Sequence, residues 1–212
     1  MLPNSLKDLI ANLKILPGIG GKTAERLAFA MIDFDKNVLT NFANSVLDIR
    51  DKITRCKICG NIADNDICSV CSDVNRDFST VFVVEKPKDI ILFEKLGVYK
   101  GVYHVLNGLI SPLDGVGPDE IAISELLDRI NNSNIKEVIL ALKPSLEGET
   151  TMQYIKRILC DKQVKISKIA NGVPIGTDME YIDSLTLEFL FQIVFPYQIY
   201  YLRIRRQFLE EF

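Results

Sequence analysis

Four of the five cysteines form two close pairs, and their spacing is typical of a metal site. Two residues separate Cys56 from Cys59 and Cys68 from Cys71, and eight residues lie between the pairs. Two such pairs can supply the four thiolates of a tetrahedral zinc site. Because four sulfur ligands leave no position for water or substrate, the pattern predicts one structural Zn2+ per chain and no zinc hydrolysis chemistry. Four free or disulfide-bonded cysteines are the alternative.

The fifth cysteine and the single histidine offer little for catalysis. Cys160 follows Ile158 and Leu159 in an expected helix, so we predict a small buried apolar residue. His104 lies inside the apolar stretch 102–106 and is predicted to be a structural histidine with its hydrogen bonds satisfied. Without it, no histidine-based catalytic pair can be assembled.

A glycine-rich stretch near the start of the chain favours contact with nucleic acid. Residues 16–24 read Leu-Pro-Gly-Ile-Gly-Gly-Lys-Thr-Ala. Gly18 and Gly20 allow backbone conformations and close approaches that other residues forbid, and the helix that follows would direct its positive end at a phosphate. Lys22 and Arg26, four residues apart on that helix, would each add a charge-assisted phosphate contact. None of these groups reads base sequence.

Two other interpretations of this stretch compete with DNA contact. A nucleotide-binding P-loop would need glycine where Leu16 stands and a strand before it, whereas the preceding pattern is helical. An ordinary turn between two helices, with Ile19 packed between them, remains the alternative.

Three carboxylates are expected at one edge of a sheet. Glu85 follows the apolar stretch 80–84, and Glu147 and Glu149 come shortly after the stretch 137–142. The carboxyl ends of strands are where ligands usually bind in open α/β sheets. Clustered acids of this kind hold Mg2+ for phosphoryl transfer in the Toprim fold of topoisomerases and primases, which this constellation resembles. A solvated acidic rim without a ligand remains open.

The elements that position these residues can be read from the apolar periodicity. Helical spacing predicts a helix from Leu6 to Leu13 with Ser5 as its N-cap, a second helix after the glycines, and a third from about Lys36 to Ile53 capped by Asp35. Beyond residue 79, apolar strands alternate with helical stretches, which predicts a mainly parallel sheet covered on both faces. The expected strands are 80–84, 102–106, 137–142 and 165–170.

The chain is therefore predicted to be a multidomain α/β protein. The expected parts are the hairpin region, the four-cysteine knuckle, the α/β domain and a C-terminal segment, at residues 1–54, 55–72, 79–172 and 173–212. Residues 1–60 contain nine Lys and Arg against six Asp and Glu, although the whole chain has a net charge of −3. This asymmetry suggests an anionic partner for the first quarter. The cysteine usage and the absence of a secretory pattern at the start suggest the cytoplasm.

Together these motifs resemble the RecR family of bacterial recombination mediators. The shared features are the order of hairpin, four-cysteine knuckle and Toprim domain, and the stretches 103–106, 111–115, 147–149 and 178–181. The resemblance implies a non-enzymatic homo-oligomer, a dimer or tetramer, that forms a ring around or along DNA. It also implies action with RecO, and in some contexts RecF, to load RecA onto single strands coated with SSB.

The resemblance also implies roles for individual residues. The hairpin cations that contact DNA in the family match Lys22 and Arg26, and its zinc cysteines match the four above. Its Toprim acids, implicated in contact with RecO, match Glu85, Glu147 and Glu149.

Three positions depart from the family pattern. Gly21 stands for proline, Asn107 for glycine and Lys143 for asparagine. Lys143 places a cation near the acidic rim and should weaken any Mg2+ site there. The runner-up function is a Mg2+-dependent Toprim enzyme acting on phosphodiesters.

The end of the chain departs most from the family. After Leu187, residues 188–202 are strongly apolar and aromatic, but Gln192, Pro196 and Gln198 interrupt them, and they are too short for a membrane span. A contact between subunits is the first expectation, and packing on the parent domain is the second.

Overall fold

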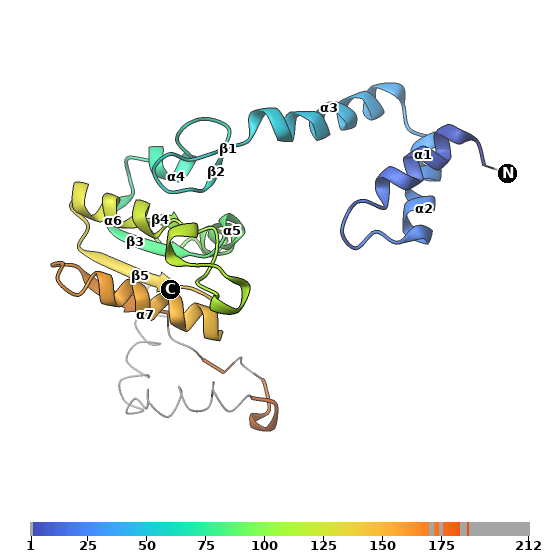
Figure 1. The fold of residues 1–212 in the computed structure, drawn as a ribbon. Helices are drawn as coiled ribbons and strands as arrows, with labels where there is room; N and C mark the ends of the chain where they lie inside the picture. Colours follow the sequence, from blue (N-terminus) through green and yellow to red (C-terminus); the bar gives the residue numbers. More distant parts are fainter. Residues whose placement is uncertain (1, 170–171, 174–175, 183–185, 187–212) are drawn as a thin grey trace, which may run out of the picture. The chain divides into compact units, whose positions relative to one another are not determined.

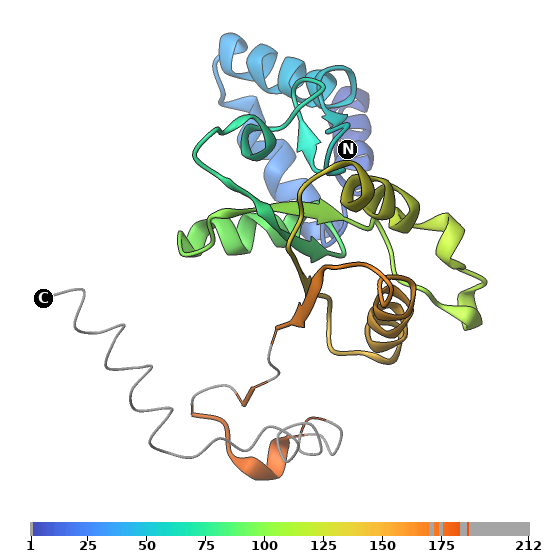
Figure 2. The ribbon, with the colours of Figure 1, turned by 90° about the vertical axis from the view of Figure 1, so that its left-hand side faces the viewer.

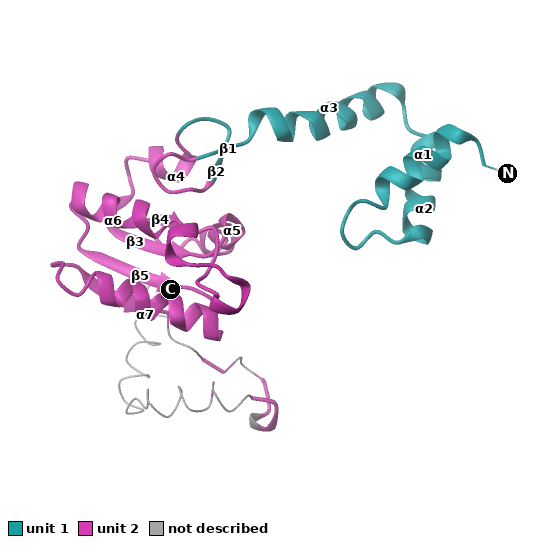
Figure 3. Cartoon of the chain, viewed as in Figure 1, with its two compact units in different colours: residues 1–55, 62–66 teal, residues 56–61, 67–212 magenta. Residues whose placement is uncertain are grey.

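The computed structural model describes residues 2–169, 172–173, 176–182 and 186. The apolar stretch 188–202 lies outside the described residues. The chain divides into two compact units (Figure 3). Unit 1 contains residues 1–55 and 62–66, and unit 2 contains residues 56–61 and 67–212.

Unit 1 contains the three predicted helices. They are α1 (Asn4–Leu13), α2 (Gly21–Ile32) and α3 (Lys36–Lys52), followed by an antiparallel ribbon of β1 (Thr54–Arg55) and β2 (Ile62–Ala63). The predicted cap at Ser5 is wrong, because α1 begins at Asn4, two residues before the predicted start at Leu6, and Pro3 occupies the N-cap position. Asp35 does occupy the N-cap of α3, but its carboxylate makes no capping hydrogen bond.

Helices α1 and α2 share a small core, whereas α3 buries none of its residues. Leu6 and Leu13 of α1 pack with Ala24 and Ala28 of α2, and the two alanines allow the close approach. The apolar face predicted for α3 is present but exposed within unit 1, at Val38, Phe42, Val46 and Leu47. Apolar area of this extent usually marks an interface.

Unit 2 is built on the predicted parallel sheet (Figures 1 and 2). Its strands are β3 (Asp77–Val84), β4 (Gly101–Val105), β5 (Glu137–Ala141) and β6 (Lys165–Lys168), in the order β4-β3-β5-β6. All three strand pairings are parallel. The helices are α4 (Ser69–Ser72), α5 (Pro87–Leu96), α6 (Ile123–Asn132) and α7 (Leu146–Ile158), and the short 3-10 turns are η1 (Pro112–Asp114), η2 (Pro118–Glu120) and η3 (Met179–Tyr181).

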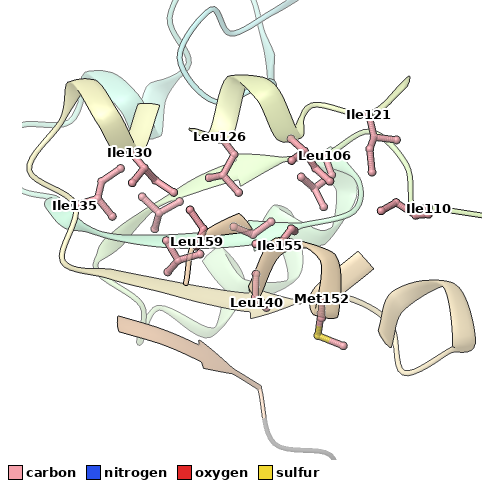
Figure 4. Close-up of a cluster of buried hydrophobic side chains, with 14 of the residues drawn as sticks. Leu106, Ile110, Ile121, Leu126, Ile130, Ile135, Leu140, Met152, Ile155 and Leu159 are labelled. Atoms are coloured by element: carbon pink, nitrogen blue, oxygen red, sulfur yellow. The ribbon is translucent and has the colours of Figure 1, made fainter. Parts of the chain in front are cut away.

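Both faces of the sheet are covered, as the apolar strands predicted. Alternate strand residues such as Val81 and Val83 point into a core that α6 and α7 close (Figure 4). The other face carries Phe82, whose ring meets those of Phe93 on α5 and Tyr99 at centroid distances of 4.6 and 4.9 Å. Burial on both faces is the reason that β4 reads as a continuous apolar strand.

Two predictions about single residues are changed by the structure. Cys160 is exposed, because α7 ends at Ile158 and the cysteine lies in the turn that follows. His104 is buried as expected, and its Nε2 lies 2.8 Å from the carbonyl oxygen of Ala122. However, its Nδ1 has no hydrogen-bond partner, so the expectation of full satisfaction is only half met. In the part of the chain that the structure describes, no helix has the length and apolar character that a membrane crossing requires.

The buried histidine predicts a loss of stability in acid. Burial, followed by the charge of Arg129, lowers the pKa of His104 from 6.5 to about 4. Because the unfolded chain binds the proton more readily, the free energy of unfolding should fall by roughly 3 kcal/mol as the pH drops from about 7 to 4. His104→Gln keeps a donor for Ala122 but cannot titrate, so its urea unfolding should lack this component. Both proteins carry the same cysteines, and equal pH dependence would contradict the assignment.

Candidate nucleic-acid, metal and acidic sites

The loop between α1 and α2 is a tight turn followed by an open helix start. Pro17 and Gly18 are the central residues of a turn closed by a 3.1 Å hydrogen bond from Ile19 N to Leu16 O. Gly18 has a φ of 80°, which is the left-handed value that the second central residue of a type II turn requires. Ile19 packs against the α1–α2 core, and this contact holds the turn in place.

The first N–H groups of α2 are available to a ligand. Gly20 is the N-cap residue, and no side chain caps the helix. Backbone donors at an uncapped start, together with the helix dipole, form an anion site. Lys22 and Arg26 are exposed on the side of α2 opposite the buried Ala24 and Ala28, and among the described residues no ion pair involves either cation. The turn with a packed Ile19 and the exposed cations, which were predicted as alternatives, are therefore both present in the structure.

The four paired cysteines converge in unit 2. Their sulfur atoms lie within 4.8 Å of one another, and all four residues are buried. The Sγ atoms of Cys59 and Cys68 are 3.6 Å apart, close to the edge of a tetrahedron with zinc–sulfur bonds of about 2.3 Å. The geometry therefore fits one structural Zn2+, and the donor set leaves no open coordination position.

The first cysteine pair is shaped by a short turn. Gly60 N donates to Cys56 O at 2.9 Å, and Cys56 N donates to Asn61 O at 2.7 Å. Gly60 has a φ of 74°, which favours glycine. The hydrogen bond with Cys68, then that with Cys71, and burial raise the pKa of the Cys59 thiol, while the hydrogen bond with Cys59 lowers the pKa of the Cys68 thiol. Because a metal takes all four sulfur atoms as thiolates, its binding must release the proton that Cys59 holds.

An acidic hollow of about 560 Å³ opens at the carboxyl edge of the sheet. Glu85 follows β3 directly, and Glu147 lies in the first turn of α7; both line the hollow. Lys143 lines the hollow as well. Glu85 is also paired with Lys86, with a distance of 3.1 Å between Oε1 and Nζ. The hollow therefore carries mixed charge, with carboxylates in excess.

Glu147 is held by the loop that precedes α7. Ser145 caps the helix by accepting from Gly148 N, and its hydroxyl donates to Glu147 Oε2 at 2.7 Å. This hydrogen bond is the main reason that the pKa of Glu147 is lowered, so the carboxylate stays charged. A side chain at Gly148 would collide with the backbone oxygen of Lys143, so glycine is required for this close packing.

Glu149 is placed elsewhere. It ion-pairs with Lys168 at 2.9 Å and is not among the residues that line the hollow. Two further carboxylates do line it, Asp114 of η1 and Glu120 of η2. Neither residue follows a strand directly, so the expectation that site residues lie at the carboxyl ends of strands could not identify them. The only sequence signal was that Asp114 lies within the stretch 111–115.

Asn107 also lines the hollow and explains one departure from the family pattern. Its φ is 63°, and it is the one described non-glycine residue with a positive value. Asparagine is among the few residues that adopt this left-handed conformation readily, so it can stand where glycine is usual.

The zinc site predicts a specific outcome for cysteine substitutions. Cys59→Ser should abolish the one zinc per chain and lower the melting temperature by more than about 10 °C, since ligand loss removes a large binding free energy from a loop with little core of its own. Cys160→Ser is the matched control and should keep both values. Zinc content by mass spectrometry and thermal unfolding measure the effects. Retained zinc in the Cys59 variant would contradict the ligand set.

Three family models match the chain in the order of its parts. The helix-hairpin-helix of RecR matches residues 6–49, the four-cysteine zinc finger domain of RecR matches residues 53–73, and the Toprim domain matches residues 79–170. The matches cover the hairpin, the four cysteines and the sheet.

Two curated relatives extend the match to most of the chain. Recombination protein RecR of Staphylococcus haemolyticus (strain JCSC1435) is 45% identical over 185 residues, which is 87% of this chain and 93% of the relative. Recombination protein RecR of Staphylococcus aureus (strain Newman) has the same identity and coverage. The chain therefore belongs to the RecR family of recombination proteins.

Proposed function

We propose that this chain is a non-enzymatic DNA-binding scaffold of recombinational repair, which acts with RecO, and in some settings RecF, to load RecA on single-stranded DNA. The observation that carries the proposal is the uncapped start of α2 beside two exposed cations, Lys22 and Arg26. Backbone donors and cations of this kind hold phosphates without reading bases. A scaffold that must act at any sequence needs this property.

The hairpin predicts a uniform loss of DNA affinity on removal of its charges. Lys22→Ala combined with Arg26→Ala should weaken binding to single- and double-stranded DNA of any sequence and reduce the salt slope by about two phosphate contacts. Lys7→Ala with Lys36→Ala removes the same charge elsewhere in unit 1 and is the control. Fluorescence anisotropy over a range of salt concentrations gives both quantities. Unchanged affinity of the hairpin variant would contradict the DNA assignment.

The acidic hollow supports a protein partner more than a catalytic centre. Its carboxylates suit a cationic protein surface, which we propose that RecO supplies, while Lys143 and the Lys86 pair of Glu85 oppose the binding of a bare divalent cation. Charge neutralisation by Glu85→Gln with Glu147→Gln should therefore weaken the affinity for RecO at least tenfold and leave DNA affinity unchanged.

The runner-up, a Mg2+-dependent enzyme, is tested with the same variant. Nicked, supercoiled and single-stranded DNA incubated with Mg2+ should give no product. Product that forms with the wild-type chain and disappears in the doubly neutralised variant would establish the enzyme and overturn the scaffold.

A homo-oligomer is part of the proposal. Helix α3 exposes Val38, Phe42, Val46 and Leu47 within unit 1, and this apolar face suits a second copy of the chain. A dimer or tetramer that closes around DNA would suit a loading factor, and the cysteine usage favours a cytoplasmic location.

A further inference from the structure

The end of β4 lies between the loop that carries Cys56, Cys59, Cys68 and Cys71, here called the cysteine loop, and the acidic hollow. β4 is an edge strand, so one side of it has no strand partner in the described sheet. The cysteine loop covers part of that side, where Val105 N donates to Cys59 O at 2.8 Å. A methyl group built on Gly60 would lie 3.2 Å from Val105 O and 3.7 Å from Asn107 Nδ2. The loop is therefore packed tightly against the strand end.

The other side of the same strand end forms a wall of the hollow. Leu106 N donates to Val84 O, and Asn107 N donates to Glu85 O, both at 2.9 Å. Asn107 and Glu85 both line the hollow. Three consecutive backbone N–H groups, those of Val105, Leu106 and Asn107, thus join the end of β4 to the cysteine loop, to β3 and to Glu85. The side of the hollow that Glu85 and Asn107 line is called the Glu85 wall.

We propose that zinc binding to the cysteine loop fixes the position of Asn107 and of the Glu85 wall, and so sets the affinity of the acidic hollow for its cationic partner. The four thiolates hold the Cys59–Gly60 turn, with its left-handed Gly60, in place. This turn then holds β4 at the edge that has no strand partner in the described sheet. Without the metal, Cys59 O has no fixed position, and the strand end frays from its edge inward.

This role is separate from the stability that zinc supplies to its own loop. It makes Gly60 a positioning residue for a site that the metal does not touch. The inference about affinity rests on the proposed function, whereas the inference about the wall does not.

Hydrogen exchange measured by NMR on the full chain tests the wall directly. Removal of zinc with a chelator under reducing conditions should lower the protection of the Val105 and Asn107 amides at least tenfold. The Val138 and Leu140 amides, in the inner strand β5, report the lower global stability of the zinc-free chain, and their loss of protection should be at least tenfold smaller. Unchanged protection at Asn107 would overturn the proposal, and equal loss in β5 would show global unfolding and overturn it as well.

A matched pair of glycine variants tests the affinity. Gly60→Ala and Gly97→Ala place the same methyl group on left-handed backbones, with φ values of 74° and 68°, but nothing lies within 4 Å of the methyl at position 97. Gly60→Ala should weaken RecO binding at least threefold and leave DNA affinity unchanged, whereas Gly97→Ala should match the wild type. RecO binding by Gly60→Ala equal to that of the control would contradict the coupling.

The two proposals fail in different ways. If the zinc-loaded wild-type chain does not bind RecO, the proposed partner is wrong, and the exchange experiment still decides whether zinc fixes the wall. If RecO binds, but zinc removal does not change the protection of Asn107 and Gly60→Ala does not change RecO binding, the scaffold stands and the coupling is wrong.

Discussion

The parallel pairing of β3 with a strand on each side is the constraint on which unit 2 depends. It brings the carboxyl ends of β4, β3 and β5 to one edge, and the loops that leave these strands must form the acidic hollow there. The same pairing buries both faces of the sheet. The apolar side chains that stabilise the sheet therefore also hold the strand ends at the acidic hollow in place. A change in the register between β3 and β4 would separate Glu85 from Asn107, because Asn107 N donates to Glu85 O only in the observed register.

Metal ligation replaces a hydrophobic core where the chain has little apolar material. The cysteine loop buries its four ligands but few other side chains. Its carbonyl at Cys59 also satisfies an edge N–H of the sheet, which natural sheets must otherwise protect. The zinc site therefore belongs structurally with the sheet of unit 2, and the hairpin that we propose to contact DNA belongs to unit 1.

The sequence predicted those features that local patterns encode. Apolar runs indicated the four strands, cysteine spacing indicated the metal site, and Pro17-Gly18 indicated the turn. The prediction failed where the direction of a side chain depends on a difference of one or two residues, either along a helix or in the position of the helix end. Glu147 and Glu149 lie in the same helix, where residues two apart point to nearly opposite sides, so only one can face the hollow. Cys160 is exposed because α7 ends two residues before it.

In the proposed scaffold, unit 1 contacts DNA and unit 2 contacts the protein partner, so the two contacts are separate functions. The most direct test is the affinity of RecO for the zinc-loaded full chain that carries Lys22→Ala and Arg26→Ala, measured by calorimetry without DNA. We expect an affinity within twofold of the wild type, because the hairpin cations belong to unit 1 and the acidic hollow to unit 2. A loss of RecO binding as large as the loss of DNA binding would contradict the account.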